Sequence, residues 1–256
     1  MRHFIVSVMG VIFCIFVAGC SIPVMDLAHI AQVDTTYAAK GSITISQFED
    51  KRPDKEKVVG KTASNSLSGQ VWSGETNPEM MLFFQQALLE ETERTGLFSQ
   101  EGHDTYELSG YVNSMKVERN VTVMRYLGLI PLIAGILASE PGENNYFWYG
   151  LAGSLILTSL DFPLFKATVG FQAVLTKNGE VVFDKQISII ERKRYWAMTE
   201  WGWKGVSNDA AVVMDVAITK SIGQLFEKIE SEINSGGTDV SRISPIGRGA
   251  GIPDQR

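Results

Sequence analysis

The fold is decided by three consecutive stretches of sequence, FKATVGFQAVL (165–175), TKNGE (176–180) and VVFDKQISII (181–190). The first and third stretches alternate apolar with polar or small side chains, which is typical of strands that bury one face. Asn178-Gly179 lies between them, and Asn-Gly between two strands is the strongest short hairpin signal. These residues therefore predict an antiparallel β-hairpin.

Two more strands are predicted upstream. Ser42–Phe48 alternates polar and apolar residues before the charged break at 49–54. Tyr106–Val117 alternates again. The residues at 54–77 are polar and rich in Gly and Ser, so we expect a long loop there.

Two helices are predicted around these strands. Asn77-Pro78-Glu79 combines a capping residue, a first-turn proline and an acid, and Thr95-Gly96 marks the end of that helix. Asn208-Asp209 opens a second, longer helix. Its apolar stripe comprises Val212, Val213, Val216, Ile222, Leu225, Phe226, Ile229 and Ile233.

The element order favours an α+β fold, an antiparallel-rich sheet with two helices on one face. We expect this domain at residues 41–234, interrupted at 120–164 by an apolar, helical hairpin insertion. Residues 20–40 show no clean period and are expected to form a tether. Residues 235–256 are rich in Gly, Ser, Pro and charge, which is typical of a disordered tail.

The N-terminus predicts export and lipidation. Met1–His3 is short and basic, Phe4–Phe16 is almost wholly apolar, and Val17-Ala18-Gly19-Cys20 follows. This is the form of a secretory signal at residues 1–19, and its end resembles the bacterial lipobox, which implies acylation of Cys20. An uncleaved anchor helix is the weaker alternative, because about 13 apolar residues are short of the ~20 needed to span a bilayer. The residue after the cysteine is Ser21. In lipobox proteins, Ser rather than Asp at this position implies sorting to the outer membrane.

Composition excludes several classes. The chain has 23 Lys and Arg against 29 Asp and Glu, and loss of Arg2 with the signal leaves a net charge near −7. Such a chain is a poor candidate for nucleic acid. The two cysteines, Cys14 and Cys20, are expected to be removed and acylated respectively, which leaves no disulfide and no cysteine metal site. We expect no metal and no cofactor.

The insertion has two apolar legs, 126–138 and 146–160, joined by a polar turn that holds Pro141-Gly142. Three interpretations are open: a hairpin that dips into a bilayer, a contact between subunits, or plain core over the sheet. Tyr and Trp at the start of the second leg suit a membrane interface. The candidate contact residues are Leu129, Ile133, Leu137, Trp148, Tyr149 and Leu155.

Catalytic motifs are not found. Gly60-Lys61-Thr62 lacks the earlier glycine of a phosphate loop, and His29 and His103 lie near no nucleophile pattern. The acids at 49–54 are interleaved with Lys and Arg and predict a solvated turn. Trp201 and Trp203 are further candidate partner contacts, with packing under the second helix as the alternative.

The segments 41–119 and 165–234 resemble a group of envelope proteins. The residues that carry the resemblance are Ile45–Arg52, Val59-Gly60, Ala87–Leu89 and Gly96-Leu97-Phe98. They are similar to the YajG-type periplasmic lipoproteins and, more loosely, to the TolB N-terminal domain, the curli-secretion-channel lipoproteins and lipid-transport lipoproteins. The resemblance implies a non-enzymatic, lipid-anchored outer-membrane component that serves assembly or transport by binding envelope proteins or copies of itself. The alternatives are a ring-forming secretion channel subunit and a periplasmic hydrolase that uses Glu49, Asp50 or Glu191.

Overall fold

The structure is a computed structural model, and it describes residues 25–57, 70–72, 76–98, 104–120, 127, 129–139, 145–159, 164–195 and 203–235. The expected signal, Cys20 and the expected tail from residue 236 onward lie outside these residues.

The main sheet is built around one long strand, β6. Its six strands are β2 (Ser42–Ile45), β3 (Glu49–Asp50), β4 (Gln70–Trp72), β6 (Thr105–Asn120), β7 (Leu164–Lys177) and β8 (Glu180–Arg194). On one side β6, β7 and β8 run antiparallel to their neighbours over almost their whole length. On the other side β6 pairs in turn with β2 and β3, which are parallel to it, and with β4, which is antiparallel. A small parallel pair joins β1 (Met25–Asp26) to β5 (Thr76–Asn77).

The predicted β-hairpin is confirmed as β7 and β8. Asn178 has φ 52° and Gly179 has φ 87°. These left-handed conformations are what a tight two-residue turn requires, and Asn and Gly adopt them at least cost.

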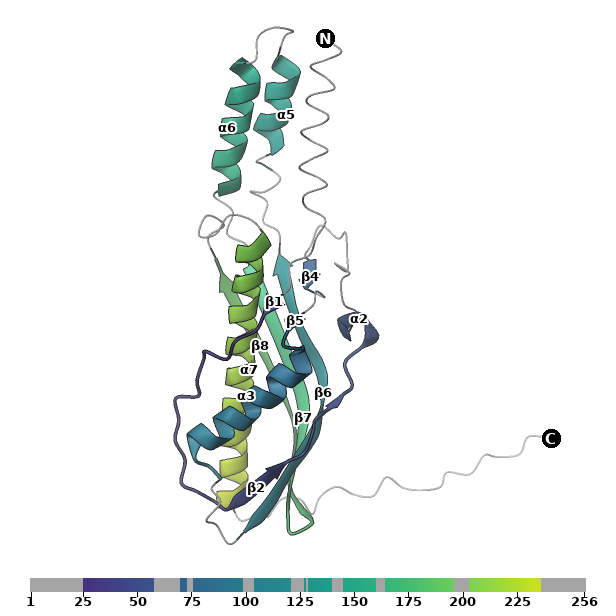
Figure 1. The fold of residues 1–256 in the computed structure, drawn as a ribbon, viewed down its shortest axis with the longest axis vertical. Coiled ribbons are helices and arrows are strands. Elements are labelled where there is room, and N and C mark those ends of the chain that lie inside the picture. The colour runs from purple at the N-terminus through teal and green to yellow at the C-terminus, as the bar shows by residue number, and fades with distance from the viewer. Residues whose placement is uncertain are drawn as a thin grey trace, which may run out of the picture.

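The helices are α2 (Asp54–Lys57), α3 (Met80–Thr95), α5 (Leu129–Ala138), α6 (Asn145–Ser159) and α7 (Trp203–Asn234). Helices α3 and α7 cover one face of the sheet, while α5 and α6 project beyond one end of it (Figure 1). The predicted α+β class, with two helices on one face of an antiparallel-rich sheet and a helical hairpin inserted into it, is therefore confirmed.

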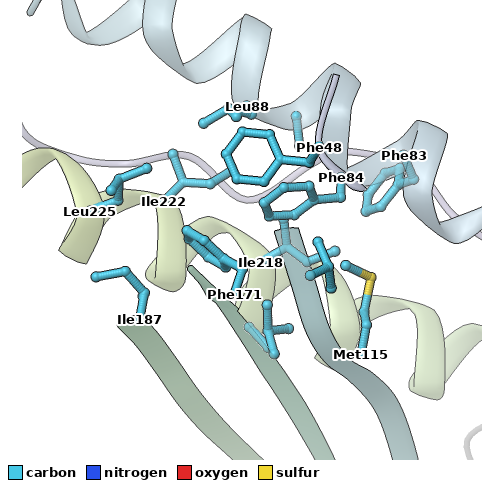
Figure 2. Close-up of a cluster of buried hydrophobic side chains, with 14 of the residues drawn as sticks. Phe48, Phe83, Phe84, Leu88, Met115, Phe171, Ile187, Ile218, Ile222 and Leu225 are labelled. Atoms are coloured by element: carbon cyan, nitrogen blue, oxygen red, sulfur yellow. The ribbon is translucent and has the colours of Figure 1, made fainter. Parts of the chain in front are cut away.

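The core fills the layer between this face and the two helices. Figure 2 shows Phe48, Phe84 and Phe171 gathered between α3, α7 and the strands. Their rings meet at centroid distances of 5.2 to 6.1 Å in tilted and edge-on arrangements, which are the favourable geometries for aromatic pairs. Leu88 and Phe226 are fully buried in the same cluster.

Both helix starts differ from the prediction. Helix α3 begins at Met80 after Glu79, without a side-chain cap, because Asn77 is already paired with Asp26 in the small sheet. Helix α7 begins at Trp203, upstream of the predicted Asn208. Val212 lies on its exposed side rather than in the apolar stripe. The end of α3 is as predicted, since Gly96 has φ 68°.

The described part of the expected long loop at 54–77 also differs, because it contains α2, β4 and β5. The charged turn before it is partly buried. Arg52 is only 7% exposed and donates two hydrogen bonds from its guanidinium to the carboxylate of Asp50. Since Asp50 lies in β3 and is paired with β6, the acids here support the sheet edge rather than a fully solvated turn.

The expected tether is wrong for residues 25–40, which are packed onto the domain and are called the strap below. Met25, Leu27 and Val33 are buried against the two helices. The strap runs along α7 in the same direction as that helix, since His29 bonds Asp215 and Lys40 bonds Asn234. It has no sequence period because it is irregular, with its polar groups satisfied by distant side chains.

Candidate functional site

The hairpin of α5 and α6 holds most of the large apolar side chains that are exposed among the described residues. Each of its six predicted contact residues is exposed, from 47% for Leu155 to 80% for Leu137. The members are Leu129, Ile133, Leu137, Trp148, Tyr149 and Leu155. Patches of this kind mark membrane or protein contacts on a folded protein.

The hairpin does not belong to the core. It leaves the sheet between Asn120 and Leu164, which are paired across β6 and β7. Its helices pack on each other and project beyond the end of the sheet (Figure 1). The interpretation of the insertion as plain core over the sheet is therefore wrong, because α3 and α7 already cover that face.

The two helices of the hairpin approach each other through glycines. A Cβ added to Gly135 would lie 2.6 Å from the carbonyl oxygen of Tyr146 and 2.8 Å from the Cα of Gly150. Ser154 is also buried in the hairpin. Small residues are thus required where the backbones cross, which leaves the large apolar side chains on the outside.

The legs carry no charge over their described residues, Leu127, 129–139 and 145–159. None of the described helices has both the length and the apolar character needed to cross a bilayer.

The second notable site is a buried cluster on the strap, which the sequence did not predict. His29 Nδ1 lies 2.8 Å from Asp215 Oδ1 on α7, and its Nε2 lies 2.9 Å from Glu91 Oε1 on α3. The backbone amides of Ile30 and Ala31 donate to the other oxygen of Asp215. The imidazole thereby joins the strap to both helices, and we call this group the His29 clamp.

The surroundings of the clamp shift the pKa values of His29 and Glu91. Burial alone would lower the pKa of His29, but the hydrogen bonds to Asp215 and Glu91 outweigh burial and raise it. Burial alone would raise the pKa of Glu91, but its bonds with Arg94, the Val33 amide and His29 lower it. Both shifts favour an ion pair between the histidine and its carboxylates.

The clamp is arranged for structure rather than for metal binding. Both ring nitrogens of His29 already contact carboxylates, and the carboxylates accept further hydrogen bonds from Arg94 and backbone amides. No group of three metal-ligating residues suited to an ion is found in the described parts of the chain.

A groove of about 760 Å³ lies between the strand segment 45–50 and the first turns of α3. Its walls combine apolar and acidic side chains, among them Met81, Leu82, Glu49 and Glu79. Leu82 is 58% exposed at its rim.

The remaining predicted site residues are not brought together. Glu49 pairs with Lys51 at 3.0 Å, and Glu191 pairs with Lys220 at 2.7 Å on the other edge of the sheet. Trp201 lies outside the described residues, and so does the side chain of Trp203 in the first turn of α7.

Comparisons with known proteins give distant likenesses. No family model matches the chain, and no curated protein matches it. A solved structure from Xanthomonas campestris, assigned to the family DUF330, is 9% identical with a TM-score of 0.45, and the match covers 84% of this chain and 99% of that one. A structure from Acinetobacter baumannii, described as a minor lipoprotein, is 12% identical with a TM-score of 0.31, over 73% of this chain and 91% of that one. Likenesses this remote carry no argument about this chain.

Proposed function

We propose that this chain is a non-enzymatic lipoprotein of the bacterial outer membrane that faces the periplasm and serves envelope assembly or transport by binding protein partners. The observation that carries the membrane part of the proposal is the α5–α6 hairpin, because it displays apolar surface outside a complete core, whereas the partner-binding part rests on the groove beside α3. The lipobox supports the membrane part, since Val17-Ala18-Gly19-Cys20 implies a lipid anchor at the N-terminus of the mature chain.

A binding role is supported by what the carboxylates do. Glu49, Asp50 and Glu191, the residues that a hydrolase would use, each form an ion pair with a neighbouring Lys or Arg. A carboxylic acid that acts as a general acid is usually set in an apolar or like-charged environment. Each of these three carboxylates faces a Lys or Arg side chain instead.

The groove beside α3 is the surface that we propose for protein partners. Its mixture of apolar and acidic side chains suits an extended segment that carries apolar residues and Lys or Arg. The Gln85 side chain joins α3 to the segment that follows β2 on the other side of this groove. It accepts a hydrogen bond from the Phe48 amide and donates one to the Ser46 carbonyl. The groove is thus a fixed feature of the domain surface.

In-cell photocrosslinking tests the proposal. A photoreactive residue at Leu82 reports on the groove, one at Trp148 reports on the hairpin, and one at Val181, next to the β7–β8 turn, is the exposed control. We expect crosslinks to envelope proteins from Leu82 and not from Val181. Self-crosslinks in one large complex would instead favour the ring-forming channel subunit.

Two further measurements complete the test. Mass spectrometry of the mature chain should find acylated Cys20 at its N-terminus, and Cys20→Ala should remove the protein from the outer-membrane fraction. The proposal fails if no position crosslinks to envelope proteins, and a hydrolytic activity that Glu49→Gln or Asp50→Asn abolishes would favour the hydrolase instead.

A further inference from the structure

The surface of the α5–α6 hairpin points to a lipid bilayer as its occupant. We propose that the hairpin is immersed in the acyl chains of the membrane that holds the Cys20 anchor. The identity of that membrane rests on the proposed function, whereas the immersion rests on the hairpin itself.

The apolar side chains are spread around the hairpin rather than gathered on one face. At about 100° per residue, Ile133 lies about 200° from Gly135 around α5 and Trp148 about 200° from Gly150 around α6, so the exposed side of each helix faces away from the contact between them. Ile136, Ile133 and Ile130 cover about 120° of α5. They are 38%, 53% and 59% exposed, and Trp148, Leu155 and Ile156 continue the exposed surface on α6. A protein partner with one flat face would leave part of this surface in water, but acyl chains cover all of it.

The contact between the two helices is of the kind that holds helices together in lipid. In a bilayer, helices associate through small residues that let the backbones approach, because burial of large apolar side chains gives no advantage over lipid. Gly135 and Gly150 meet in this way, with Ser154 buried nearby. A helix pair built for water would place its large apolar residues between the helices instead.

The two ends of the hairpin are suited to headgroups. Tyr146, Trp148 and Tyr149, all more than half exposed, lie next to the turn, and Tyr and Trp concentrate at membrane interfaces. The turn sequence contains Glu140 and Glu143, and charged side chains are strongly disfavoured at the centre of a bilayer. We therefore place the turn at headgroup level and the middle of the legs deepest.

The position of the anchor agrees with this placement. The strap enters the domain near the half of α7 that contains Asp215 and runs away from the hairpin toward Asn234 (Figure 1). Met25 therefore lies on the hairpin side of the domain, and the five residues back to Cys20 reach at most about 17 Å. A membrane that holds the acyl chains is within reach of the base of the hairpin.

Immersion does not require the hairpin to cross the bilayer. Ten residues of α5 and 15 of α6 correspond to about 15 and 22 Å, against about 30 Å for the hydrocarbon core. A hairpin of this length can lie roughly parallel to the bilayer surface within one leaflet, with both ends close to one headgroup layer and the apolar side chains of its legs among the acyl chains.

Depth-dependent fluorescence quenching in vesicles tests the proposal. Acylation of Cys20 blocks its thiol, so the mature protein accepts one label at an introduced cysteine. The variants are Ile133→Cys in the middle of α5, Trp148→Cys near the turn, and Leu82→Cys on α3 as an equally exposed control. The acylated protein is placed in phosphatidylethanolamine–phosphatidylglycerol vesicles that carry nitroxides at the headgroup or deep in the acyl chains.

We expect deep nitroxides to quench the label at Ile133 at least twofold, headgroup nitroxides to quench the label at Trp148 more than deep ones, and the Leu82 label to be unaffected. Equal, weak quenching at Ile133 and Leu82 would overturn the proposal. A blue-shifted Ile133 label that no nitroxide quenches would show burial against protein and would also overturn it. Quenching without envelope crosslinks refutes only the proposed function, and crosslinks without quenching refute only immersion.

Discussion

Replacing His29 by alanine is expected to lower the free energy of unfolding by about 3 to 5 kcal/mol near pH 5.5, because it removes the charged partner of buried Asp215 and one of the two charged partners of buried Glu91. The side chains of Glu91 and Asp215 are 1% and 4% exposed, so water cannot take the place of the imidazole. Each lost charge-assisted hydrogen bond contributes about 1.5 to 3 kcal/mol. The two lost bonds together amount to about 3 to 6 kcal/mol. We expect a value in the lower part of this range, since Arg94 and backbone amides still contact the carboxylates.

Thermal unfolding followed by circular dichroism measures this effect. For a chain of this size, about 3 kcal/mol corresponds to a decrease of roughly 10 °C in Tm. Lys40→Ala is the matched control on the same strap, because its bond to Asn234 is exposed and should be worth less than about 1 kcal/mol.

The difference between wild type and His29→Ala should depend on pH. The pKa of His29 is raised in the folded state, so its stabilisation is full below the unfolded value of 6.5 and is lost as pH rises through the folded value. The pKa of Glu91 is lowered, so its contribution is present above the ordinary value of 4.5 and is lost as pH falls through the folded one. The difference in Tm between wild type and His29→Ala should thus be largest between pH 4.5 and pH 6.5. An unchanged Tm at pH 5.5, or a difference that persists undiminished at pH 9, would refute a charged clamp.

Three other outcomes are expected from the fold. Leu88→Asp should unfold the domain because Leu88 is fully buried, whereas Leu89→Asp, at a position 45% exposed, should leave Tm within about 2 °C. Replacing 121–163 by a short turn should preserve the domain and its Tm, since Asn120 and Leu164 are already paired; collapse on deletion would show that the insertion supports the core. Gly150→Leu should separate α5 from α6 without changing the Tm of the domain, and hydrogen exchange would register faster exchange confined to the hairpin.

The sequence predicted those elements that have a local signal. The turn at Asn178-Gly179 and the end of α3 at Gly96 depend on backbone conformations that few residue types adopt, so they could be located from the residues alone. The apolar legs of the hairpin were equally visible, although the sequence could not show that α3 and α7 leave no room for them on the sheet.

The strap and its clamp could not be predicted, because their partners are distant in sequence. His29 lies 62 residues from Glu91 and 186 from Asp215, and no local pattern connects them. The short strand β1 likewise depends on pairing with Thr76 and Asn77. A weak hint was present, since Glu91 and Asp215 occupy buried-face positions of otherwise apolar helical stripes, and a buried acid implies a partner.

The strap also determines how the domain would respond to mechanical load. Any pull that a moving membrane or partner exerts between the acyl chains and the domain enters at Met25 and meets the two-residue pairing of β1 first. The force then reaches His29, whose bonds to α3 and α7 distribute it between two long helices instead of passing it to a strand edge. A force that pulls the strap away from the domain would have to break the ion pairs of His29 before it could expose Val33 or the sheet beneath. The clamp would therefore protect the rest of the domain from a force applied near the anchor.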